Sequence, residues 1–150
     1  MLARWLNQLT TTQEDSSQSA QQRLRLAMAV LLVDVARADW EDDPRERQSI
    51  CQSLQAHCQL SPADAESLLV EAEGTRDDVA SLHSYLRVIN EEATQEQKQQ
   101  LLDSLWKVAF ADGELAAYEE HTIRRMAELL YLPHADFIQS KLRHQPGSDT

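Results

Sequence analysis

One stretch of the sequence occurs twice, once in each half of the chain, and this internal repeat limits the folds that the chain can adopt. Residues 35–50 align with residues 108–123 at an offset of 73, and seven of the sixteen positions are identical. Chance would give about one identity, at ~6–7% per position for common residue types. We therefore expect two similar structural units that pack against each other.

The repeat continues further along each half with a shift of one residue. Residues 60–64 read Leu-Ser-Pro-Ala-Asp, and residues 132–136 read Leu-Pro-His-Ala-Asp, an offset of 72. Each half therefore reads as a long helix, an acidic turn, a capped helix and a shorter capped helix.

Helix signals recur at short intervals along the chain. The residues that introduce capping patterns, each followed by an acid or a glutamine, are Asp43, Ser61, Thr75 and Thr94. Gly74 is a typical helix end. Residues 22–39 and 101–110 are apolar on nearly all sides, which is typical of helices surrounded by other helices. The chain has only three glycines and few β-branched or aromatic residues, so a sheet is not expected.

These patterns predict an all-α fold. We expect a single domain of about seven helices, arranged as two pseudo-symmetric repeats around two central apolar helices. A chain of 150 residues is long enough to bury its core without disulfides or metals. We expect residues 1–19 to form a flexible or loosely docked leader, residues 20–143 the helical domain and residues 144–150 a disordered tail.

The charge and hydropathy of the chain exclude some classes of partner. The formal charge is −11, and no basic stripe interrupts the acidic surface, so nucleic acid is not an expected partner. The longest apolar run, residues 26–33, is far shorter than the ~20 residues that cross a bilayer. The N-terminus has no signal-peptide core. We expect a cytoplasmic protein without membrane insertion.

The acidic turns are the candidate functional feature. Asp112 lies where a helix is expected to end, and the helix dipole disfavours a carboxylate there by up to ~1 kcal/mol. Two explanations stay open. Asp112 accepts backbone hydrogen bonds in a turn that contains Gly113, while Glu119 caps the next helix. Alternatively, Asp112, Glu114 and either Glu119 or Glu120 hold a hard divalent cation through their oxygens, although their spacing differs from an EF-hand loop.

The first half carries the matching carboxylates Asp39, Glu41 and Glu46. Trp40 replaces the glycine of the second half, and Trp tolerates a positive φ poorly, so the two turns are expected to differ. Arginines such as Arg47 interleave with these acids, which also fits a solvated, partly ion-paired surface. Acids at helix ends near water lack a reason for a raised pKa, so we expect a non-enzymatic protein.

The segment "VAFADGELAAYEEHTI", with the apolar helix before it and "MAELLYLPHADF" after it, resembles the TerB-like family. This family includes the tellurite-resistance protein TerB and the N-terminal domain of the membrane-anchored co-chaperone DjlA. The resemblance covers roughly residues 24–142. It implies an all-helical domain with internal pseudo-twofold repetition and, for TerB, an acidic divalent-metal site and a role in stress-response complexes. The site residues that it implies are Asp39, Glu41, Glu46, Asp112, Glu114 and Glu119.

Two functional hypotheses follow. The first is a TerB-like, stress-associated domain that binds a divalent cation, Ca²⁺ or Mg²⁺, at its acidic turns and couples this binding to an unidentified protein partner. The alternative is a metal-free protein–protein interaction module, resembling the co-chaperone domain, whose acidic turns only cap helices.

Overall fold

The computed structural model describes residues 2–37, 44–74, 79–111, 115 and 117–145, and within these ranges all regular structure is α-helical. The helices are α1 (Leu2–Arg37), α2 (Pro44–Cys58), α3 (Pro62–Gly74), α4 (Val79–Glu92), α5 (Gln95–Ala109), α6 (Ala117–Leu129) and α7 (His134–His144). The prediction of an all-α domain of about seven helices is thereby confirmed.

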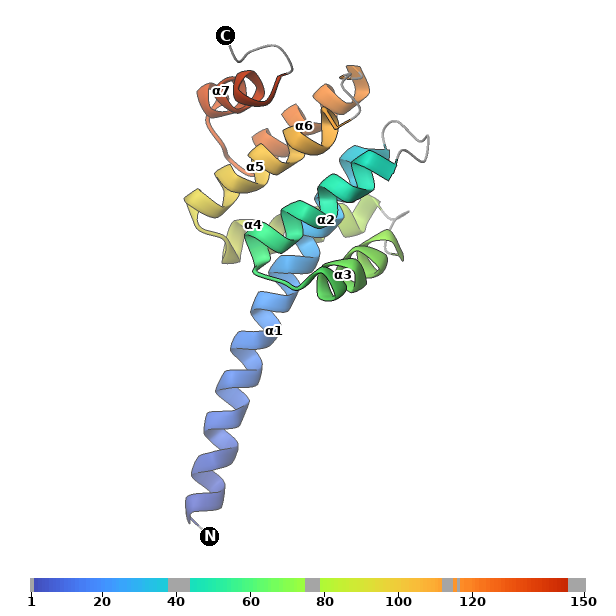
Figure 1. Cartoon of the computed structure of the whole chain (residues 1–150). Coiled ribbons are helices and arrows are strands. Elements are labelled where there is room, and N and C mark those ends of the chain that lie inside the picture. The colour runs from blue at the N-terminus through green and yellow to red at the C-terminus, as the bar shows by residue number, and fades with distance from the viewer. Residues whose placement is uncertain (1, 38–43, 75–78, 112–114, 116, 146–150) are drawn as a thin grey trace.

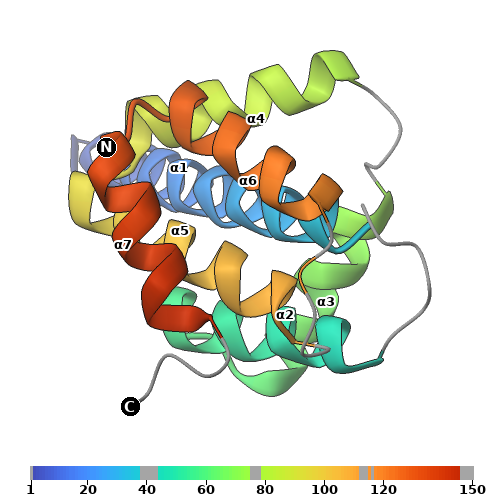
Figure 2. The same ribbon diagram turned by 90° about the horizontal axis from the view of Figure 1, so that it is seen from above.

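Two helices form the centre of the bundle, as the sequence predicts. The C-terminal part of α1 contacts α2, α3, α4, α5 and α6, and α5 contacts α1, α2, α6 and α7 (Figure 2). All seven residues from Ala27 to Val33 are buried, because neighbouring helices cover this part of α1 on every side. The predicted pseudo-symmetry of the two halves stays a prediction.

The N-terminal half of α1 extends away from the bundle (Figure 1). The helix runs without a break through residue 20, where the sequence analysis placed the start of the domain. Extending an existing helix adds one hydrogen bond per residue without a new nucleus, so a polar segment can continue a helix that the core has nucleated. The division into leader, domain and tail stays a prediction. None of the described helices is long and apolar enough to cross a bilayer.

Local sequence sets the ends of several helices. Thr94 forms the expected capping box with Gln97: the Thr94 hydroxyl accepts from the Gln97 backbone at 3.1 Å, and the Gln97 side chain accepts from the Thr94 backbone at 2.8 Å. Gln59 after α2 and Tyr131 after α6 both adopt left-handed backbone conformations, with φ of 54° and 59°. The next amide, that of Leu132, then bonds back into α6, and the chain turns sharply into α7.

An aromatic cluster fixes α7 against the rest of the bundle. The fully buried Trp106 of α5 packs against Phe110 and against Phe137 of α7, with ring centroids 5.8 and 5.2 Å apart. Arg124 of α6 lies 5.5 Å above the Phe137 ring. These contacts join α5, α6 and α7, and they position the polar groups described below.

Candidate functional site

The structure describes two of the six carboxylates that the sequence assigns to a metal site, Glu46 and Glu119. The other four lie outside the described residues; they are Asp39, Glu41, Asp112 and Glu114. Glu46 is the third residue of α2, and Glu119 is the third residue of α6. The two glutamates therefore occupy the same position in two helices that begin 73 residues apart.

Both glutamate side chains are buried, with Glu46 4% exposed and Glu119 0% exposed. Burying a carboxylate costs several kcal/mol unless hydrogen bonds or opposite charges compensate. The start of a helix supplies part of that compensation, because its free N–H groups and its dipole favour negative charge. Both residues also take part in further interactions. Glu46 and Glu119 are therefore built into the fold and are not part of a solvated surface.

The expectation that the first acidic segment is a solvated surface is wrong for Glu46, because that side chain is buried. Arg47 does form ion pairs, but with α3. Its guanidinium donates to both oxygens of Glu66 at 2.9 and 2.6 Å and to Glu73 at 3.1 Å. The hydrogen bonds that Arg47 donates to Glu66 and Glu73 raise the pKa of Arg47 above its ordinary value. Arg47, which follows Glu46 in the sequence, thus links the N-terminal part of α2 to α3.

No group of three or more His, Cys, Asp or Glu side chains arranged to hold a metal ion occurs among residues whose placement is described. Glu46 and Glu119 are the part of the predicted acidic site that can be located. One oxygen of each carboxylate, Oε1 of Glu46 and Oε2 of Glu119, is buried and accepts no hydrogen bond within the described ranges. A donor set made only of carboxylate oxygens suits hard cations such as Ca²⁺ and Mg²⁺.

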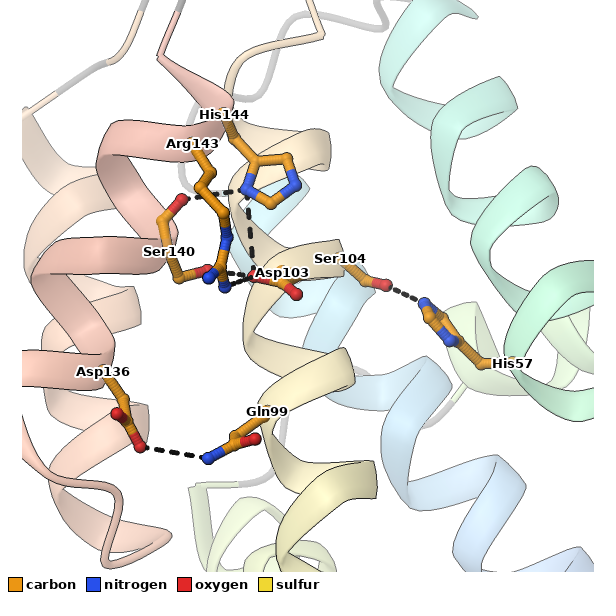
Figure 3. A network of polar contacts seen from close by, with 8 residues as sticks. All are labelled: His57, Gln99, Asp103, Ser104, Asp136, Ser140, Arg143 and His144. Carbon is orange, nitrogen blue, oxygen red and sulfur yellow. Dashed lines mark hydrogen bonds and ion pairs between the residues drawn. The ribbon is translucent and has the colours of Figure 1, made fainter.

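A polar network that the sequence analysis missed joins α5 to α7 (Figure 3). Asp103 of α5 accepts hydrogen bonds from the Ser140 hydroxyl and, at 2.8 Å, from the Arg143 guanidinium. The His144 ring lies 2.8 Å from the Ser140 carbonyl and 3.9 Å from the Asp103 carboxylate. Burial alone would raise the pKa of Asp103, but the hydrogen bonds from Ser140 and Arg143 outweigh it and leave this pKa below its ordinary value. Asp103 is therefore ionised near neutral pH.

The next residue of α5 reaches a different helix. Ser104, fully buried, places its hydroxyl 2.5 Å from Nε2 of His57 on α2 (Figure 3). Burial, together with the nearby positive charge of Lys107, lowers the pKa of His57. His57 contacts Ser104, whereas Asp103 contacts α7, so these groups do not line up as a serine–histidine–aspartate relay. Their geometry fits a role in holding α2 and α7 against α5.

The fold and the buried helix-start glutamates define the chain as an acidic, all-α bundle domain built around two central helices. The chain belongs to the family of the tellurite resistance protein TerB, whose family model matches residues 25–142. The resemblance inferred from the acidic segment is thereby confirmed, over nearly the predicted extent. No curated protein and no solved structure matches the chain significantly.

Proposed function

We propose that this TerB-family domain is non-enzymatic, binds a divalent cation at its acidic turns and couples that binding to a protein partner. Membership of the family supports an association with tellurite resistance. The cation, the partner and the coupling between them are the further content of the proposal.

One observation carries the proposal: the near-complete burial of Glu46 and Glu119 at the same position of two helices. A glutamate that only caps a helix interacts with backbone N–H groups, and such residues are seldom fully buried. Burying two carboxylates costs free energy unless hydrogen bonds or opposite charges compensate, and a bound cation would add to that compensation. Capping explains where these glutamates lie, and a cation would explain why they are enclosed.

The sequence ahead of each buried glutamate supplies more carboxylates, and in the first half Arg45 lies between these carboxylates and Glu46. Residues 38–43 contain four carboxylates and no Lys or Arg, and residues 112–116 contain two and again no Lys or Arg. A bound cation would balance charge that the segments themselves leave unbalanced. In this proposal Glu119 acts with Asp112 and Glu114. The corresponding residues of the first half are Glu46, Asp39 and Glu41.

Calorimetric titration of chelator-treated protein with Ca²⁺, Mg²⁺ and Mn²⁺ tests the cation. Wild type should give a saturable heat with at least one of them. Glu119→Gln and Glu46→Gln keep the shape but remove the charge, and each should weaken binding roughly tenfold or more if its carboxylate is a ligand. Glu128→Gln, at an exposed position of α6, is the matched control and should bind like wild type. A wild type that gives no heat with any of the three cations contradicts the proposal.

A second candidate, a metal-free interaction module, is favoured by the third-residue position of both glutamates, which is the acceptor position of a capping box. Capture of partners from a native lysate, with and without chelator, separates the two. Partners retained unchanged in chelator favour the metal-free module. Loss of the same partners in chelator and in Glu119→Gln, but not in Glu128→Gln, favours the cation.

A further inference from the structure

A groove of about 750 Å³ lies between α3 and the part of α1 that leaves the bundle. Three half-buried leucines that pack against the core, Leu26, Leu60 and Leu68, give the groove an apolar base. It therefore offers an apolar strip beside the root of a helix that extends away from the bundle (Figure 1).

The two walls of the groove carry opposite charges. Arg23 and Arg25 line it from α1, and Asp64 and Glu71 line it from α3. Within the described residues these four side chains form no ion pair, and three of them, Arg23, Asp64 and Glu71, are exposed. The walls thus present charge to an incoming surface and not to each other.

We propose that the groove binds α1 of a second copy of this chain, giving a dimer with two-fold symmetry. In such a pair the same patch serves on both sides, so residue i meets residue j and residue j meets residue i. The arginines of each α1 would lie beside Asp64 and Glu71 of the other copy. The charges that line the groove are therefore complementary to a second copy, and Leu26 of each chain gains apolar neighbours.

The extended half of α1 points to the same occupant. The core nucleates this helix, but most of the stability of helices in proteins comes from packing against other elements. In Figure 1 residues at the N-terminal end of α1 lie far from every other helix of the same chain. A second α1 lying along the groove would supply a protein surface for this segment.

Sedimentation equilibrium of the full chain, in buffer with chelator and from about 1 to 200 μM, tests the proposal without involving the cation. Wild type should show a concentration-dependent dimer. Two double variants should each weaken the dimer at least about tenfold, because every reversed contact occurs twice. They are Arg23→Glu with Arg25→Glu, and Asp64→Arg with Glu71→Arg. The control reverses two exposed arginines away from the groove, Arg87→Glu with Arg125→Glu, and should dimerise like wild type.

An equimolar mixture of the two groove variants is the decisive sample. Each variant alone opposes like charges, but in the mixture an acidic α1 meets a basic α3 and a basic α1 meets an acidic α3. The mixture should therefore form heterodimers at wild-type strength, which also shows that both variants are folded. A wild type that is monomeric throughout overturns the proposal, and so does a dimer that neither groove variant weakens or a mixture that stays monomeric.

Discussion

Replacing Asp103 with asparagine should loosen α7 from α5 and destabilise the domain. The Asp103 carboxylate accepts from the buried Ser140 hydroxyl and from Arg143, and these bonds cross between two helices that also share the Trp106–Phe137 contact. Asparagine keeps the shape and one acceptor oxygen but removes the charge. The variant therefore tests the charge on Asp103 without opening a cavity.

The expected loss is about 1.5–2 kcal/mol of unfolding free energy. A hydrogen bond to a charged group is worth ~1.5–3 kcal/mol and a neutral one ~0.5–1.5 kcal/mol, so the bond to buried Ser140 loses about 1 kcal/mol. The Arg143 side chain is 58% exposed, and an ion pair so open to water contributes no more than ~1 kcal/mol. At ~2–4 °C per kcal/mol for a chain of this length, the melting temperature should fall by about 3–8 °C.

Urea unfolding at pH 7 and at a pH close to 3 measures the loss of stability in Asp103→Asn. Comparing the two pH values shows whether the charge on Asp103 causes that loss. The pKa of Asp103 in the folded protein lies below its ordinary value, so its stabilising effect is complete above the unfolded-state pKa of about 3.9 and is lost as the pH falls through the lower folded value. The difference between wild type and Asp103→Asn should shrink over that range. Glu128→Gln, which removes an exposed charge, should stay within about 0.5 kcal/mol of wild type. A variant as stable as wild type at pH 7, or an equal loss at both pH values, would refute this account of the network.

Two further predictions concern single positions. Because the pKa of His57 is lowered, the folded state binds fewer protons than the unfolded state, and wild-type stability should fall as the pH drops through about 6.5. His57→Gln should flatten this pH dependence in urea unfolding from pH 8 to 5.5. Parallel curves for the variant and wild type would contradict the prediction. Tyr131→Gly should raise the melting temperature by up to about 4 °C, because the tyrosine is 78% exposed and holds a left-handed φ of 59° that glycine adopts freely. The same change at the helical residue Tyr118 should lower the melting temperature, and a fall in both variants would count against the strain argument.

The fold class could be predicted because its determinants are local in the sequence. The Thr94 capping box lies within a few residues of the groups that it satisfies, and it forms as expected. Near-continuous apolar character marked the two central helices, since a helix covered on all sides has no polar face. The acidic segment around residue 112 was specific enough to indicate the TerB family, and the family match over residues 25–142 confirms it.

The side-chain contacts between helices could not be predicted in this way. Asp103 meets partners 37 and 40 residues further along the chain, and Arg47 meets Glu66 and Glu73, which lie 19 and 26 residues further along. Such pairs depend on how each helix is rotated about its axis and on the angle at which helices cross, and neither is encoded in a short motif. The repeat did single out Glu46, but not its burial, because burial depends on the helices that cover it.

Binding of a divalent cation at the acidic turns can be measured through the melting temperature of chelator-treated protein with and without Ca²⁺ or Mg²⁺. A cation that binds only the folded state, at 100 times its dissociation constant, adds about 2.7 kcal/mol. For a chain of this length that is a rise of roughly 5–10 °C. Wild type should show such a rise with at least one of the two cations, Glu119→Gln should show a smaller rise, and Na⁺ at matched ionic strength should cause none. An unchanged melting temperature of wild type at millimolar concentrations of both cations would contradict the proposed cation binding.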